Sequence, residues 1–282
     1  MTSPLPGHFS QILGDAAEDD FYSLALHLGY RVVRERNPVP GIDFVAEFDG
    51  ERPNLQLQRP IFSPDGITAF SVKRGDFGND DIAILKDYID DAHKSNDPTL
   101  NKIRGGVIVT SSLKSEGTLN DLATQQLFCW DVRRMMLYSS KARLAAEWSD
   151  LGLVTEMPMH RKLVGSYMLV PYELCHGVLK TKVSVFVDNH DLVLQGDHMN
   201  TALNEIYKNG LKPMIRSMSA KEIETTIVVH SAGPIQRRVV LQACDDFAKG
   251  DQHAGVTFLV SGFEFQSYSA APWTAFLRFP FI

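Results

Sequence analysis

The chain has 282 residues, of which 44% are hydrophobic and 22% are charged, and its formal net charge at pH 7 is −6. We expect a globular protein with one large domain or two domains of ordinary size. The acidic balance excludes a protein whose whole surface is basic and coats nucleic acid. A polyanionic ligand would therefore need a local basic patch or bound metal ions.

The cysteines and the N-terminal segment bear on the cellular compartment. Cys129, Cys175 and Cys244 are widely separated, and no CxxC pair indicates a zinc site or a redox motif. The first ten residues lack the basic start and apolar stretch of a signal peptide, and no apolar run reaches the roughly 18 residues of a spanning helix. We expect a cytoplasmic protein that does not enter the membrane.

The first predicted element is a helix in the segment 14–30, and Gly29 is its expected C-terminal stop. Glu18 lies one position round from its apolar stripe, at the edge of the face that packs on the core. Strands are then predicted over 30–36, 42–48 and 55–60, with turns at 37–41 and 49–54. The apolar stripe has helical spacing and consists of Ala17, Phe21, Leu24 and Leu28.

The next segments alternate between strand and helix. Helices covering a sheet are expected from this order, so residues 1–150 are predicted to form an α/β domain. The predicted strands are 67–75, the buried run 105–112 and the strand-like 128–138, and the predicted helices are 81–94, 117–127 and 141–148.

A change in composition over residues 149–162 predicts a linker, and residues 160–282 are predicted to form an α+β domain for substrate or partner recognition. The aromatic segment 271–282 is predicted to pack into a core or an interface. No internal repeat is evident in the sequence. The predicted strands are 163–171, 180–189, 191–197, 224–232 and 254–265, and the predicted helices are 198–211 and 235–250.

Glu18, Asp43 and Lys73 form a set that indicates chemistry. Glu18 is on the first helix, Asp43 is on a strand, and Lys73 is on the neighbouring strand. Two carboxylates brought together repel each other unless a cation lies between them, and such oxygen ligands suit Mg²⁺ or Mn²⁺. A lysine beside the metal can stabilise a developing oxyanion or help to deprotonate water, so the set is typical of phosphodiester cleavage.

The order of these motifs resembles the PD-(D/E)XK nuclease superfamily, notably its Mrr-like, restriction-endonuclease-like and antiviral-defence branches. The motifs are Glu18 in "GDAAED", then "GIDF", "SVK", "GGVIVTSS" and "FCWDVRR", and they cover about the first half of the chain. The resemblance implies a mixed sheet flanked by helices, with metal ligands at Asp43 and at position 71. It also implies a DNA-cleaving enzyme, an antiviral effector first and a restriction-type enzyme second. The acidic net charge predicts a modest affinity for DNA, so we expect a protein partner or homo-oligomerisation to strengthen binding.

The sequence departs from the superfamily pattern because the second acidic position is Ser71. A migrated carboxylate can replace the missing ligand, and the candidates are Glu18 and Asp87, which follows Lys73 by 14 residues. Ser71 would then orient a metal-bound water or bond to the phosphate. The rival interpretation is a catalytically silent fold that serves as a binding subunit of a multi-protein defence complex.

Other interpretations of these residues remain open. Glu18 and Asp87 also suit a solvated helix face, Asp43 a turn at the start of a strand, and Lys73 an edge strand protected by its charge. A Ser71–Lys73 hydrolase dyad lacks any oxyanion-hole motif. In the second half the acidic and histidine residues match no established ligand spacing and favour a hairpin turn; they are His176, Asp188, His190, Asp191, Asp197 and His198.

Overall fold

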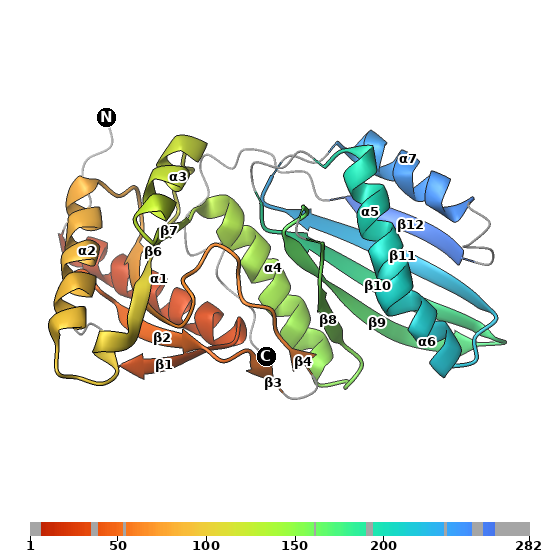
Figure 1. Cartoon of the computed structure of the whole chain (residues 1–282), viewed down its shortest axis with the longest axis horizontal. Coiled ribbons are helices and arrows are strands. Elements are labelled where there is room, and N and C mark those ends of the chain that lie inside the picture. The colour runs from red at the N-terminus through yellow and green to blue at the C-terminus, as the bar shows by residue number, and fades with distance from the viewer. Residues whose placement is uncertain are drawn as a thin grey trace. The chain divides into compact units, whose positions relative to one another are not determined.

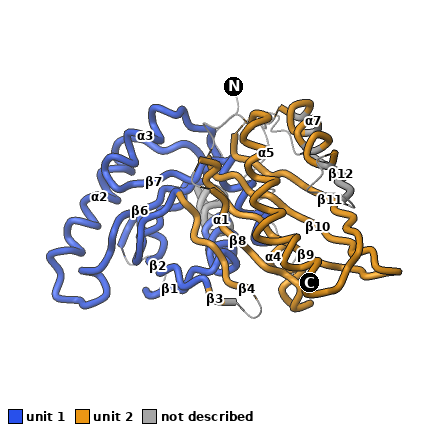
Figure 2. Tube along the Cα trace, turned by 45° about the vertical axis from the view of Figure 1, so that its right-hand side comes forward, with its two compact units in different colours: residues 1–50, 62–143, 268–282 blue, residues 51–61, 144–267 orange. Residues whose placement is uncertain are grey.

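The computed structural model describes residues 7–34, 39–52, 55–160, 162–189, 194–233, 236–249 and 256–262. These residues form two compact units, which Figure 2 colours separately. The first unit takes residues up to 50 and 62–143, and the second takes 51–61 and 144–267. The division therefore falls inside one helix and assigns residues 51–61 to the second unit, which the composition of the chain does not indicate.

The sheet of the first unit is mixed. Its strand order is β1-β2-β5-β6-β7 (Figure 1), in which the first three strands are antiparallel neighbours and β5, β6 and β7 are parallel. Parallel neighbours need a crossover connection, and a helix supplies each one. The strands are β1 (Tyr30–Arg34), β2 (Phe44–Phe48), β5 (Ile67–Lys73), β6 (Ile103–Thr110) and β7 (Leu127–Trp130).

Helices α2 (Asn79–Lys94) and α3 (Glu116–Thr124) are these crossovers, and both pack on the same core. A short 3₁₀ turn, η1 (Leu100–Lys102), lies between α2 and β6. The residues of β5 and β6 that pack against these helices are apolar, whereas Ser71 and Lys73 end the same face of β5. This core contains Ala69, Ile108, Leu85, Ile89, Leu119 and Leu122.

An aromatic cluster packs around α1 (Gly7–His27), apart from the residues that α2 and α3 bury. Phe21 of this helix stacks on Phe44 of β2, with ring centroids 5.6 Å apart, and contacts the ring of Phe70 in β5 at the same distance. The four predicted stripe residues of α1 are buried, and Gly29 ends the helix with φ of 93°, so both predictions are confirmed. Aromatic packing therefore fixes the helix that carries Glu18.

The second unit also contains a mixed five-stranded sheet, ordered β12-β11-β10-β9-β8. β8, β9 and β10 are antiparallel neighbours, whereas β10, β11 and β12 are parallel. A two-stranded sheet of β3 (Glu51–Arg52) and β4 (Leu55–Gln56) also belongs to this unit. The other strands are β8 (Thr155–Pro158), β9 (Gly165–Cys175), β10 (Val178–Val187), β11 (Glu222–Ser231) and β12 (Val256–Gly262).

The helices of the second unit connect the parallel strands. α5 (Gly196–Ile206) continues through the π-helical η2 (Tyr207–Leu211) into α6 (Lys212–Ser217) and leads to β11, and α7 (Arg237–Ala248) leads to β12. Residues of α5 and α7 share one core with β9, β10 and β11. The predicted α/β class is therefore confirmed, with two mixed sheets flanked by helices.

Some predicted elements differ from the structure. Residues 128–138 are not one strand, because α4 (Val132–Ser149) begins directly after β7. The Asp131 carboxylate accepts the N–H of Arg134, as an N-cap residue does, and Met, Leu and Arg then favour the helix. The predicted linker 149–162 contains β8, a short strand at the edge of the sheet that composition does not reveal.

Further predictions are shortened or lie outside the described residues. The strand expected over 55–60 is only Leu55–Gln56. In the segment 191–197, residues 191–193 lie outside the description and Gly196 begins α5. The segment 271–282 also lies outside it. No helix in the described part of the chain combines the length and apolar character that a membrane crossing requires.

Candidate active site

Asp43 lies directly before β2 and is fixed to the neighbouring strand by its backbone and its side chain. Its N–H donates to the carbonyl oxygen of Phe70 at 2.9 Å, and its Oδ2 accepts the N–H of Val72. Only 8% of the residue is exposed. A buried carboxylate held by an N–H donor has one defined orientation, so Asp43 is the anchor of the candidate site.

Glu18 reaches Asp43 from α1, and their side chains are hydrogen-bonded to each other. Burial raises the pKa of the Asp43 carboxyl, and the Val72 N–H, the charge of Lys73 and the bond with Glu18 offset this effect only in part. The two carboxyl groups therefore adjoin at a place where one cation could contact both.

Lys73 ends β5 and lies between two acidic groups. Its Nζ is 2.9 Å from Oδ1 of Asp81, and its charge also acts on Asp43. Asp81 is in the first turn of α2 and accepts the N–H of Gly78 at 2.9 Å. Although burial opposes it, the Gly78 N–H and the Lys73 ammonium hold the pKa of Asp81 below its ordinary value. Asp81 is thus an ionised partner of Lys73.

Sequence reasoning did not identify Asp81 as a site residue. An acidic residue in the first turn of a helix is common, because it favours the positive end of the helix dipole. The signal that could have identified Asp81 is its closeness to Lys73 in the sequence. Only a short loop separates the end of β5 at Lys73 from the start of α2, so the first turn of α2 must lie near Lys73.

Asp87 is not brought to this group. It is exposed, and it lines a pocket of about 480 Å³ together with the side chains of Val39, Ile84, Tyr88, Asp91, Ala92, Ser95 and Leu100. Asp87 follows Asp81 by six positions along the helix, which corresponds to about 9 Å along the axis and a different side of the helix. The carboxylate that α2 places beside Lys73 is therefore Asp81.

Ser71 is 1% exposed, and its hydroxyl donates to the carbonyl oxygen of Gly41 at 2.7 Å. Gly41 has φ of 89°, a conformation that favours glycine, and lies two residues before Asp43. Ser71 therefore ties β5 to the turn that leads into Asp43. Its expected role beside a metal-bound water or a phosphate stays a prediction.

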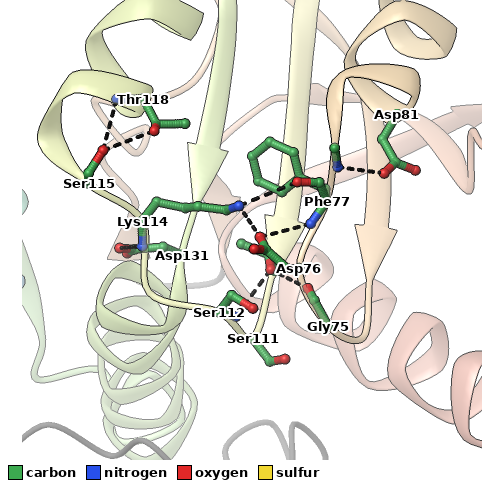
Figure 3. Close-up of polar contacts among 12 residues, drawn as sticks. Gly75, Asp76, Phe77, Asp81, Ser111, Ser112, Lys114, Ser115, Thr118 and Asp131 are labelled. Atoms are coloured by element: carbon green, nitrogen blue, oxygen red, sulfur yellow. Dashed lines mark hydrogen bonds and ion pairs between the residues drawn. The ribbon is translucent and has the colours of Figure 1, made fainter.

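The turn between Lys73 and Asp81 is held by the loop that follows β6, as Figure 3 shows for Lys114 and its contacts. Thr110 Oγ1 donates to the carbonyl of Gly75 at 2.5 Å, and Lys114 Nζ forms an ion pair with Asp76. The same ammonium lies 3.8 Å from the centroid of the Phe77 ring. The hydrogen bond from Lys114 holds the pKa of Asp76 below its ordinary value.

Three cations at this edge of the sheet are paired with carboxylates. Besides Lys73 with Asp81 and Lys114 with Asp76, Arg133 lies 3.0 Å from Oδ2 of the fully buried Asp131. Arg74, directly after Lys73, is exposed and forms no ion pair with the described residues. A phosphate would therefore meet the charge of Arg74 at this edge, and a bound metal ion would add to it.

The donor set fits a magnesium-type ion in part. The described residues contain no cluster of three or more His, Cys, Asp or Glu side chains suited to a metal. Glu18 and Asp43 nevertheless supply two adjoining carboxyl groups. Mg²⁺ is commonly held by one or two carboxylates with waters and substrate phosphates completing its shell. Two carboxylates are thus enough for an ion whose other positions are filled by waters, one or more of which a substrate phosphate replaces.

Comparison with protein-family models, with curated proteins and with solved structures found no match to this chain.

Proposed function

We propose that the protein is a metal-dependent endonuclease of the PD-(D/E)XK type that cleaves DNA, and that it acts as an antiviral-defence effector in the cytoplasm. The observation that carries this proposal is the meeting of Glu18, Asp43 and Lys73 at one end of β2 and β5. The mixed, helix-flanked sheet is the architecture that the sequence resemblance implies.

Each residue has a role in this proposal. Glu18 and Asp43 hold Mg²⁺ or Mn²⁺, which supplies a Lewis acid for the scissile phosphate and an acidified water. Lys73 orients the attacking water and stabilises the charge on the phosphate. Asp81 positions the Lys73 ammonium through their 2.9 Å contact. Ser71 positions the turn before Asp43 through its bond to Gly41.

The reaction is hydrolysis. The water oxygen forms a bond to phosphorus, one bridging P–O bond of the phosphodiester breaks, and the water proton is passed on so that the leaving oxygen becomes a hydroxyl. The products are one phosphate monoester end and one hydroxyl end. The role of Lys73 is to hold its ammonium beside the phosphate oxygens as negative charge develops on them.

Binding of DNA needs support from outside the candidate site. The net charge is −6, and Lys73 and Lys114 near the strand ends are paired with acids, which leaves Arg74 as the exposed cation beside Lys73. Nonspecific affinity for DNA comes mainly from unpaired Lys and Arg contacts with phosphates. We therefore propose that a protein partner or homo-oligomerisation supplies part of the affinity for DNA.

The second candidate function is that of a catalytically silent binding subunit in a multi-protein complex. Ser71 favours it, because this residue replaces the second acidic ligand and its hydroxyl bonds to Gly41. A protein of this kind would bind its partner or DNA equally well with and without a divalent cation. The dependence of binding on EDTA separates the two candidates.

The test is cleavage of plasmid and single-stranded DNA by the full chain with Mg²⁺ or Mn²⁺, compared with EDTA. Lys73→Ala is expected to abolish cleavage, while Lys86→Ala, which removes an exposed lysine of α2, is expected to leave it unchanged. Thermal unfolding of both variants checks that the fold is kept. Cleavage by folded Lys73→Ala at the wild-type rate would refute the site.

A further inference from the structure

The two units follow the same path through their sheets. In the first sheet β1, β2 and β5 are antiparallel neighbours, and β6 and β7 follow in parallel. The strands lie side by side in the same order as in the sequence. The second runs β8, β9, β10 as antiparallel neighbours and adds β11 and β12 in parallel, again in chain order. The second sheet therefore repeats the topology of the first.

The helices repeat as well. A helix precedes the first strand of each sheet, α1 before β1 and α4 before β8, and the parallel crossovers are α2 and α3 in one unit and α5 and α7 in the other (Figure 1). In each unit the two crossover helices contribute to a single core with their sheet. An equal order of elements, with equal strand directions, indicates two copies of one fold.

The site residues do not repeat. In the third strand of the first unit, Ala69, Ser71 and Lys73 follow one another on the face toward the crossover helices. In the third strand of the second unit, the last residues on that face are Val183, Val185 and Val187, all within its apolar core. Valines thus take the positions of Ser71 and Lys73.

The residue at the position equivalent to Asp43 also differs in the second unit. Asp43 is the last residue before the second strand of its sheet, and Val164 is the last residue before β9. In the crossover helix that follows, the counterpart of Asp81 is Asp197, which lies in the first turn of α5 and is exposed. Of the counterparts of Asp43, Lys73 and Asp81, only Asp197 is acidic. It has no lysine partner at the end of the third strand, because Val187 occupies the position equivalent to Lys73.

The buried acids of the second unit are used in its structure. Glu156 accepts the hydroxyl of Ser166 at 2.6 Å and the N–H of Gln58 at 3.2 Å. Asp188 accepts the N–H of Ile61 at 3.3 Å. Both carboxylates therefore hold the segment 58–61 in place, and their lone pairs are directed at protein donors rather than at a metal.

We propose that the chain is a tandem of one cleaving and one silent copy of the same fold, and that it nicks a single strand of duplex DNA in each binding event. This rests on the proposed function. The two strands of a duplex run in opposite directions, so a site in one orientation reaches the scissile phosphate of one strand only. The hydrolysis is the one described above, performed once, in the first unit.

The test is a time course on supercoiled plasmid in excess over the full chain, with Mn²⁺. We expect open circles to accumulate, and linear DNA to form only after many open circles are present. Lys73→Ala is expected to lower the rate of nicking by at least about 100-fold, since no second site remains. Asp197→Asn, which changes the second unit's counterpart of Asp81, is expected to leave the rate unchanged.

Each outcome decides the question. Linear DNA that forms from the start at the rate of open circles, at protein concentrations where the chain is monomeric, and disappears in Lys73→Ala, would overturn the single-site proposal and leave the proposed nuclease function intact. Residual cleavage in Lys73→Ala that falls further with Asp197→Asn would overturn it by revealing a second site. Absence of all metal-dependent cleavage would overturn the proposed function, and this proposal with it.

Discussion

At the scale of single residues, the candidate site is a chain of opposite charges around Lys73. The adjoining carboxyl groups of Asp43 and Glu18 lie on one side of it, and Asp81 is an ionised partner on the other. Lys73 and Asp43 are recognisable in the sequence because a charged residue inside an apolar strand has to be explained. Asp81 was not recognisable, since an acid in the first turn of a helix is ordinary.

Asp81 and Asp87 provide a matched pair of substitutions on one helix. Asp81→Asn removes the charge that holds Lys73, so we expect metal-dependent cleavage to fall about 10- to 100-fold, as for other changes to groups that orient site residues. Asp87→Asn, on the exposed pocket lining, is expected to change the rate by less than about twofold. Single-turnover rates with Mn²⁺ measure both. Equal losses in the two variants would contradict the assignment of Asp81.

Asp43 is expected to lower the stability of the metal-free protein. Its pKa in the folded state is raised by burial, so the folded state binds the proton more tightly and stability decreases as pH rises through the ordinary carboxyl pKa toward the raised value. Asn can still accept the Val72 N–H and can donate to Glu18. Asp43→Asn is therefore expected to raise the melting temperature at neutral pH by a few degrees, about 2–4 °C. A lower melting temperature in calorimetry with EDTA would argue against this account.

At the scale of elements, the strongest periodic signals in the sequence gave the correct elements. The apolar stripe of α1 identifies a helix by its period, and the short β-branched apolar run of β6 identifies a buried strand. The signal failed at residues 128–138, because the aromatic end of β7 and the start of α4 adjoin without a loop. Asp131 as an N-cap was the missed sign.

The two glycines of β6 are required because neighbouring atoms occupy the space that a Cβ atom would need. A Cβ atom at Gly105 would lie 2.3 Å from the backbone oxygen of Gln126, and one at Gly106 would lie 2.7 Å from Cδ2 of Leu85. A backbone atom yields less than a side-chain end, so we expect Gly105→Ala to cost about 3 kcal/mol and Gly106→Ala about 1 kcal/mol of unfolding free energy. Gly75→Ala, with open space around it, serves as the control. Urea denaturation with the reverse order of costs would contradict this packing.

The ion pair between Lys114 and Asp76 predicts a pH dependence. The folded-state pKa of Asp76 is lowered, so its contribution to stability is present above the ordinary carboxyl pKa of about 3.9 and is lost as pH falls through the lowered value. Asp76→Asn is therefore expected to lose less stability than the wild type between about pH 6 and pH 3. Urea midpoints at low ionic strength measure this difference. Parallel pH profiles for the two proteins would show that the ion pair contributes nothing.

At the scale of the whole molecule, the α/β class followed from the alternation of strand and helix signals. The repeated topology could not be predicted, because the two halves share the order and direction of their strands and not their residues. Position 71 is a serine and position 185 a valine, yet both lie on the helix-facing side of a third strand. The segment 51–61 also pairs with acids far along the chain, and local sequence carries no sign of that.

The most direct test of this account is a titration of the full chain with Mn²⁺ that counts bound ions by calorimetry or by electron paramagnetic resonance. Because binding is measured without DNA cleavage, the result does not depend on a partner or a substrate. We predict one ion per chain, lost in Asp43→Asn and kept in Asp87→Asn. Undiminished binding in Asp43→Asn, or no binding in the wild type, would contradict a metal site built on Glu18 and Asp43.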